Sequence, residues 1–457
     1  MSTNFKIRRP APSQNQIVHP KVIEDIDEPT AAEEQAAPAP KKAPAGKASP
    51  DPVAKLTALA AWANTQAIGR EDLVGALVLA MVARQNVTAL GVPGTAKTYT
   101  VRKVTEAFAA KPGDVFDILL TKFTKPSEVL GPPSIKALEN DEFRYCTEGF
   151  LPTAKVGILD EMYKGSSAIL NALLQIANDR TFKNGKTTET TPLRFLVGMS
   201  NEFPEDPATL AAFFDRFPIK LMVNPLESSE FETMLAAAAA GKSTRCPVTM
   251  NDADLSEIDR RVDECAVSQE IIETLRELKM TLEQKNVRIS DRRWVQALRI
   301  LKASAVIAGR AEVSRTDLKA LEYVCWNTQA DIAVIKSAIP DFLRPFDRQL
   351  REVIDEVYAE RETIYKAANL DGADKTRPSP DGKEMSKVAA QALSRIKGVN
   401  ERVTVIVEEM AQTDEDKSLA AQATKSITAV METVKNVMMG KQGIEALKAT
   451  EKSDIGA

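Results

Sequence analysis

Residues 91–98, Gly-Val-Pro-Gly-Thr-Ala-Lys-Thr, have the residue types and spacing of a phosphate-binding loop. They follow a short apolar run and precede a helical pattern. The backbone amides of such a loop and the helix N-terminus form a concave anion site. Lys97 would reach the β- and γ-phosphates of ATP, and the Thr98 hydroxyl would bind Mg²⁺. The residues expected to bind the nucleotide here are Gly91, Pro93, Gly94, Thr95, Ala96, Lys97, Thr98 and Tyr99.

Ala96 stands where such loops usually have a second glycine. The methyl group fits if the backbone at residue 96 is helical, because a positive φ is the conformation that favours glycine. We therefore expect a helical backbone at Ala96.

Two adjacent carboxylates, Asp160 and Glu161, follow a later apolar run. Asp160 would hold Mg²⁺, and Glu161 would orient and polarise the attacking water. By itself an acidic pair at this position is also typical of a helix cap. Downstream of a phosphate-binding loop, it indicates ATP hydrolysis.

Further polar residues could complete the site. Asn201 follows an apolar run and could position the hydrolytic water, or it could be a turn residue. Arg216 could make a structural ion pair, or it could reach the γ-phosphate of an adjacent subunit as an arginine finger, which requires an oligomer. Ser290 is a candidate N-cap, after which Arg292 or Arg293 could reach the nucleotide or remain exposed.

The elements that position these residues alternate between apolar runs and helix-length segments. Central strands are predicted at 86–90, 115–120, 156–159 and 193–199. Strands separated by helices predict a parallel sheet that is covered on both faces. After Pro225 the strand pattern stops, residues 231–338 read as helical, and Pro340 and Pro345 mark a boundary.

Both ends of the chain differ in composition from this α/β region. Residues 1–53 are rich in proline and predict a disordered tail, either passive or a recruitment arm. Residues 371–382 predict a linker. Apolar stripes at 396–410 and 423–437 predict a helical hairpin, which either packs within the chain or docks a partner. The expected domains are the tail at 1–53, a large α/β domain at 54–229, a helical lid at 230–340 and a helical extension at 341–457.

Composition excludes several classes of function. The 60 basic and 64 acidic residues give a net charge of -4, which does not favour a protein that coats nucleic acid. Four dispersed cysteines and the single His19 argue against a structural zinc site or a histidine-dependent triad. No apolar run is long enough to span a membrane and no signal peptide is evident, so we expect a cytoplasmic location.

In this order the motifs resemble the MoxR family of AAA+ ATPases, especially its RavA-like branch. The loop end at 94–98 resembles the family's Gly-Thr-Ala-Lys-Thr form, alanine included. Residues 123–132 are similar to the segment with the family's insertion near helix 2, and 159–185 is the most similar stretch. Residues 290–294 resemble the start of RavA's sensor-2 helix. The resemblance covers roughly 53–328.

This resemblance implies a hexameric ring of subunits, each with a large α/β domain and a helical lid, that binds ATP and Mg²⁺. It implies that Asn201 is sensor 1, that Arg216 is the finger and that Arg292 is sensor 2. It also implies that Ile68, Gly69 and Arg70 line the adenine pocket.

The turn at Asn184–Gly185 would close a hairpin, either near the ring's pore or as an ordinary surface hairpin.

Members of the family usually work with a separate von Willebrand factor A protein. The sequence has no Asp-x-Ser-x-Ser motif, so a metal-ion adhesion site would come from that partner. We expect an ATP hydrolase that couples turnover in a homo-hexamer to chaperone-like remodelling of a protein client.

The alternative function is a ring-shaped nucleic-acid translocase with a basic pore, although nucleic acid is not the expected partner. Its candidate pore residues are Lys122, Lys125, Lys183 and Lys186. A scaffold that binds nucleotide without turnover is disfavoured by the presence of Glu161, Asn201 and Arg216.

Overall fold

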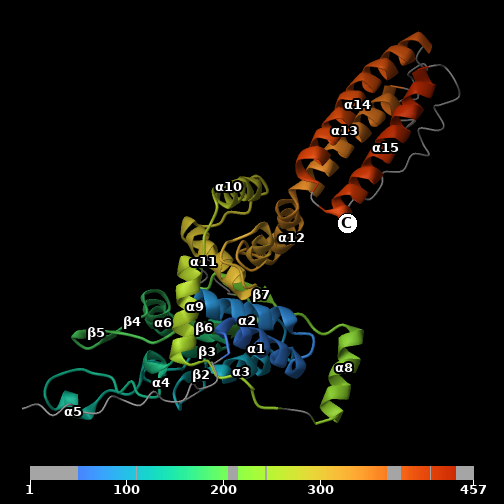
Figure 1. Cartoon of the computed structure of the whole chain (residues 1–457). Helices are drawn as coiled ribbons and strands as arrows, with labels where there is room; N and C mark the ends of the chain where they lie inside the picture. The colour runs from blue at the N-terminus through green and yellow to red at the C-terminus, as the bar shows by residue number, and fades with distance from the viewer. Residues whose placement is uncertain are drawn as a thin grey trace, which may run out of the picture. The chain divides into compact units, whose positions relative to one another are not determined.

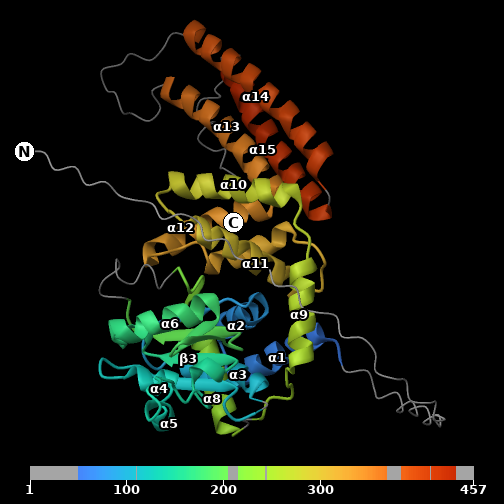
Figure 2. The same cartoon turned by 90° about the vertical axis from the view of Figure 1, so that its left-hand side faces the viewer.

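The computed structural model describes residues 50–109, 111–203, 215–241, 244–367, 382–411 and 413–438 (Figures 1 and 2). The predicted tail lies outside these residues except for 50–53, and Pro52 already begins the first helix. The predicted linker also lies outside them, except for Gly382, which begins a helix.

A five-stranded parallel sheet forms the centre of the α/β region, with the strand order β2-β3-β6-β1-β7. The strands are β1 (Val87–Leu90), β2 (Val115–Leu119), β3 (Val156–Asp160), β6 (Phe195–Ser200) and β7 (Ile219–Met222). Every neighbouring pair in the sheet is parallel. The α/β class and the four predicted strands are therefore confirmed.

The edge strand β7 is absent from the sequence-based prediction. Its four residues include Lys220, whose charge hides the apolar pattern of a buried strand. In the fold Lys220 is fully buried, and its ammonium donates to the carbonyl oxygen of Trp326. It also lies 5.1 Å from the centre of the Trp326 ring, a cation–π contact that offsets part of the cost of burial.

Helices cover both faces of the sheet. Val197 and Met199 of β6 face the core formed with α1 (Pro52–Gln66), α2 (Glu71–Ala83) and α3 (Lys97–Thr105). Leu196 faces the second core, with α4 (Pro126–Leu130) and α6 (Ser167–Asp179). The short elements are η1 (Glu106–Phe108), α5 (Ile135–Leu138), η2 (Leu151–Thr153) and η3 (Met162–Lys164).

The predicted hairpin is confirmed as β4 (Thr181–Asn184) paired antiparallel with β5 (Thr187–Thr190). Gly185 in its turn has φ +64, and a Cβ there would lie 1.9 Å from the carbonyl oxygen of Phe143. The turn therefore requires glycine on both grounds.

After the sheet the described chain is helical, as predicted. Its elements are α8 (Ser228–Ala239), α9 (Asp252–Glu264), α10 (Gln269–Gln284), α11 (Asp291–Ile307), η4 (Arg315–Tyr323) and α12 (Gln329–Leu343). Pro340 does not end α12, contrary to its expected role as a boundary. Burial of Ile339 and Phe342 on the same helix offsets the hydrogen bond that proline cannot make.

The C-terminal helices α13 (Pro345–Ala367), α14 (Gly382–Met410) and α15 (Asp414–Met438) share a core of their own. The Ser386 hydroxyl donates to the carbonyl of Met438 at 3.2 Å, so α14 and α15 run antiparallel. The predicted hairpin is thus confirmed, and α13 completes a three-helix bundle. Its apolar stripes pack within the chain.

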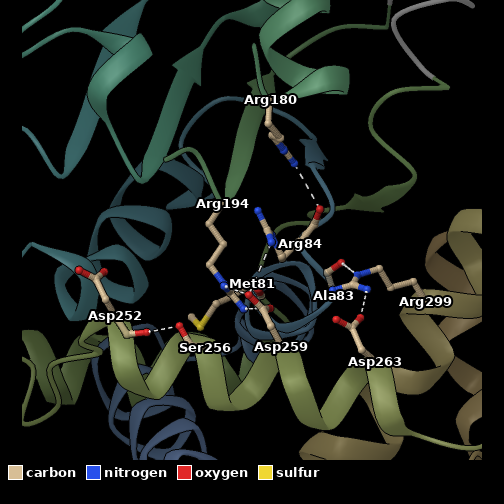
Figure 3. A network of polar contacts seen from close by, with 10 residues as sticks. All are labelled: Met81, Ala83, Arg84, Arg180, Arg194, Asp252, Ser256, Asp259, Asp263 and Arg299. Carbon is tan, nitrogen blue, oxygen red and sulfur yellow. Dashed lines mark hydrogen bonds and ion pairs between the residues drawn. The ribbon is translucent and has the colours of Figure 1, made fainter. Parts of the chain in front are cut away.

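Three arginines converge on the last turn of α2 and join it to later helices (Figure 3). The Nε atoms of Arg194 and Arg299 donate to the carbonyls of Met81 and Ala83, each at 2.9 Å. Arg180 donates to the carbonyl of Arg84 at 3.2 Å. These donors satisfy the free carbonyls at the negative end of the helix.

Two aspartates of α9, one helical turn apart, balance two of these arginines. Asp259 pairs with Arg194 at 2.8 Å, and Asp263 pairs with Arg299 at 2.6 Å. The α/β region is therefore tied to α9 by a charge pair and to α11 by the Arg299 hydrogen bond, and α9 and α11 are themselves joined by a charge pair. Among the described residues, no helix has the length and hydropathy needed to cross a membrane.

Candidate active site

The carboxyl ends of three adjacent strands bring the predicted residues together. The phosphate-binding loop follows β1, Asp160 ends β3, and Asn201 follows β6. Since β6 lies between β3 and β1 in the sheet, these ends meet at one edge. This edge is where open α/β sheets bind ligands.

Glycines shape the loop. Gly91 has φ +153, and a Cβ there would lie 2.2 Å from the carbonyl oxygen of Val223, so no other residue fits. Gly94 has φ +83, and an added Cβ would meet no heavy atom of the described residues within 4 Å. The backbone at Gly94 is therefore open on that side, as a phosphate-binding loop requires.

The expectation of a helical backbone at Ala96 is wrong. Its φ is +59 and its ψ is 21, which is the left-handed conformation. The Ala96 carbonyl still accepts the first helical bond, from the Thr100 amide at 3.0 Å. The turn into α3 thus imposes this conformation, which costs an alanine about 1 kcal/mol relative to glycine.

Ala96→Gly should therefore raise the free energy of unfolding by about 0.5–1 kcal/mol, because glycine adopts this φ without strain. The matched control is Ala236→Gly, at an exposed position within α8, which should lower the free energy of unfolding by about 1 kcal/mol. Denaturant unfolding of the three proteins measures both values. Equal destabilisation by the two substitutions would contradict the strain at residue 96.

Lys97 is buried at the base of the loop. Its ammonium donates to the carbonyls of Gly91 at 2.7 Å and Val92 at 2.9 Å, to Thr95 Oγ1 at 3.3 Å and to Asn201 Oδ1 at 3.0 Å. Burial lowers the pKa of Lys97, and the charges of Asp160 and Glu161 oppose this shift. A buried ammonium bonded to neutral oxygens keeps its positive charge for an anion such as phosphate.

Thr98 and Asp160, the two residues predicted to bind a metal ion, lie side by side. The Thr98 hydroxyl donates to Asp160 Oδ2 at 2.9 Å. A hydroxyl and a carboxylate beside a phosphate-binding loop are the oxygen ligands that Mg²⁺ prefers. The two residues thus fit a magnesium ion.

Glu161 has a left-handed backbone, with φ +51 and ψ 44, where β3 turns into η3. For a residue other than glycine this conformation costs about 1–2 kcal/mol. Such strain is often found at functional sites. One carboxylate oxygen accepts a hydrogen bond from Asn201 Nδ2, and the other lies 3.3 Å from Lys164 Nζ.

The amide of Asn201 bridges the two halves of this site. Its oxygen accepts from Lys97, and its nitrogen donates to Glu161. Both functions of the amide are used, so its orientation is fixed. The loop lysine and the Glu161 carboxylate are thereby held on either side of one side chain.

The expected adenine-pocket residues lie beside the loop. A Cβ on Gly69 would lie 2.4 Å from Leu226 Cδ2, so this segment packs closely on the chain before α8. The next residue, Arg70, is buried and donates through Nε to the carbonyl of Thr95 at 2.8 Å. Arg70 therefore links the segment that contains Ile68 to the phosphate-binding loop.

Arg216 and Arg292 lie together, but not with Lys97. Both line a cavity of about 360 Å³, here called the arginine cavity. Among the described residues, the arginines that line it are Arg84, Arg180, Arg216, Arg292 and Arg299, and the one lining carboxylate is that of Asp263. Burial and then the charge of Arg292 lower the pKa of Arg216, whereas the charged neighbours that shift the pKa of Lys97 include neither arginine.

Sequence reasoning did not find the roles of Arg70 and Arg293. The family resemblance assigns Arg70 to the adenine pocket, and no motif reveals its contact with the loop. The resemblance favours Arg292 over Arg293, but Arg293 is buried and pairs with Asp215. The only signal in the sequence was its place three residues after an N-cap serine.

Comparison with known proteins agrees with this geometry. Residues 54–260 match the model of the MoxR domain in MoxR-vWA-beta-propeller ternary systems, and residues 270–339 match an AAA lid domain. The crystal structure of a provisionally assigned ATPase from Cytophaga hutchinsonii is 19% identical with a TM-score of 0.52. The match covers 64% of this chain and 94% of the Cytophaga chain. At this sequence identity it supports the fold alone.

Relatives by sequence include two uncharacterised proteins of Methanocaldococcus jannaschii. They are 33% and 32% identical, over 65% and 66% of this chain and 76% and 80% of their own lengths. A structural protein of Acidianus two-tailed virus is 29% identical over 46% of this chain and 36% of its own length. With both domain matches in place, the chain belongs to the MoxR family of AAA ATPases, which implies that it binds ATP.

Proposed function

We propose that this chain hydrolyses ATP with Mg²⁺ in a homo-hexameric ring and uses the turnover to remodel a protein client. The observation that carries the proposal is the bridge from Lys97 through Asn201 to Glu161. This contact holds the Lys97 ammonium and the Glu161 carboxylate around one amide, which supports a phosphate-binding group beside a base. A site that only bound nucleotide would not need that base.

Each side chain has a definite task in the reaction. Lys97 and the loop amides would hold the β- and γ-phosphates, and Thr98 and Asp160 would hold Mg²⁺, which would neutralise phosphate charge. Glu161 accepts a proton from water as the water oxygen bonds to the γ-phosphorus. The bond from that phosphorus to the β–γ bridging oxygen breaks, which gives ADP and phosphate. Asn201 keeps Glu161 oriented for this step.

The separation of Arg216 and Arg292 from Lys97 supports a site shared between subunits. Guanidinium groups beside a γ-phosphate stabilise charge in the transition state. The arginine cavity holds five such groups in this chain, and a neighbouring subunit's nucleotide would supply the anion. Arg216 would then be the finger and Arg292 the sensor-2 residue, both acting on the next subunit.

The family match also supports the proposed partners. Its description places the MoxR domain in systems with a von Willebrand factor A protein and a β-propeller protein. We propose a von Willebrand factor A-domain protein as a working partner and a further protein as the client. Co-purification from cells that express the tagged chain would test this, and recovery of the chain alone would count against it.

Lys97→Ala should weaken ATP binding by about 10- to 100-fold, because it removes a charged group that donates to phosphate. Binding of a fluorescent ATP analogue with Mg²⁺ measures the change. The control is Lys103→Ala on the same helix, where the lysine pairs with Glu106 at 2.8 Å. Unchanged ATP affinity in Lys97→Ala would contradict the assignment of the nucleotide site to this loop.

Adding DNA to the ATPase assay tests the alternative function, a nucleic-acid translocase. Marked stimulation of ATP hydrolysis by DNA would favour that alternative.

A further inference from the structure

Arg293 is a buried charge with specific partners. It lies in the first turn of α11, where its amide donates to the N-cap Ser290 at 3.3 Å. Its side chain is 3% exposed, and it donates to Asp215 Oδ1 and, at 2.6 Å, to Asn327 Oδ1. A guanidinium this buried is stable only with such partners, so it fixes the position of Asp215.

Asp215 directly precedes Arg216, the proposed finger. On the other side, Asn86 Nδ2 donates to the Arg216 carbonyl at 2.8 Å. Asn86 is itself buried, and its Oδ1 accepts from the Leu196 amide of β6 at 3.0 Å. The backbone of the finger is therefore held from the sheet by Asn86 and from α11 by Arg293.

The contact with α11 is reinforced at Trp326. Its carbonyl oxygen accepts from Lys220 of β7 and also lies 3.4 Å from Arg293 Nη1. The edge strand, the segment after η4 and the start of α11 therefore share one buried polar cluster. The same first turn of α11 carries Arg292, which lines the arginine cavity with Arg216.

We propose that Asp215 and Arg293 are a positioning pair for Arg216, which couples the position of helix α11 to the finger that acts on the next subunit. This inference rests on the proposed function. The pair touches no nucleotide itself. Its role is to set where the Arg216 backbone lies when α11 moves.

A subunit-mixing experiment separates this role from a merely structural one. Subunits with Arg216→Ala keep their own Lys97 site, and subunits with Glu161→Gln keep their finger. Mixing them should restore turnover at interfaces where the second kind donates the finger. Asp215→Asn added to the Glu161→Gln subunits should lower this recovered kcat by about 10- to 100-fold, as expected for a misplaced catalytic group. Added to the Arg216→Ala subunits instead, it should leave recovery unchanged.

Two further variants act as controls. Asp215→Glu in the finger-donating subunits keeps the carboxylate and should retain most of the recovered turnover. Asp317→Asn breaks another buried ion pair, in which Asp317 is 1% exposed and lies 2.6 Å from Arg310, and should retain recovery because neither residue lines the arginine cavity.

The outcomes are distinct. Equal loss from Asp215→Asn in either kind of subunit, or no loss in the finger donors, would overturn the positioning role. The mixture of Arg216→Ala and Glu161→Gln subunits with native Asp215 is the reference. If this mixture recovers no turnover, the assignment of Arg216 as a finger is wrong, and the role of the pair is wrong with it.

Discussion

Glu161→Gln should bind ATP as tightly as the native chain and lower kcat by about 100- to 10,000-fold. The amide keeps the size of the carboxylate but cannot take a proton from water. Because Lys97 and Thr98 remain in place, the phosphates should bind as before. Steady-state ATPase measurements, with separate measurement of ATP binding, give the two quantities.

The contact with Asn201 should survive the substitution. In the native chain Asn201 Nδ2 donates to the Glu161 carboxylate. A glutamine can still accept that bond through its oxygen, so the surrounding geometry should persist. The control is Glu202→Gln, which changes a neighbouring carboxylate and should leave kcat within about twofold of the native value, as expected for a group outside the reaction. A native kcat in Glu161→Gln would contradict the role of Glu161 as the base.

Arg216→Ala should lower kcat by about 1,000- to 100,000-fold, the range measured for arginine fingers, while ATP affinity stays unchanged. The reason is the placement of Arg216 in the arginine cavity rather than beside Lys97. The loss should fall on the neighbour's site. ATPase rates measured across protein concentration, together with the oligomer's mass, test this directly.

The matched control for the finger is Arg288→Ala, an arginine outside the arginine cavity that should retain native kcat. If Arg216→Ala weakens ATP binding by the chain's own loop, the arginine acts within one subunit. That result would contradict the assignment across an interface.

The parts of the site that follow strands could be predicted from sequence. The loop after β1, the carboxylates after β3 and Asn201 after β6 each follow a recognisable apolar run, and parallel strands bring their ends to one edge. The edge strand β7 was not predicted because Lys220 interrupts its run of apolar residues. Its charge is tolerated by contacts with Trp326, which lies far along the chain.

The backbone conformation of the site residues was harder to predict than which of these residues lie close together. Ala96 and Glu161 both have positive φ, which residue type alone argues against. In each case a turn between a strand and a helix imposes the angle. The partners of Arg293 were equally hidden, because Asp215 and Asn327 meet it only through tertiary packing. Propensity and motif do not report such long-range contacts.

The arginines on the last turn of α2 affect how the chain can be divided. A fragment ending at residue 229 would lack Asp259, which would leave Arg194 beside the sheet without its counter-charge. It would also uncover the apolar surface that Leu255, Ile258 and Val262 of α9 occupy. An excised α/β piece should therefore aggregate or be digested rapidly by protease, whereas one that retains α9 and α11 should survive. For this chain, α9 and α11 are part of the smallest piece worth expressing.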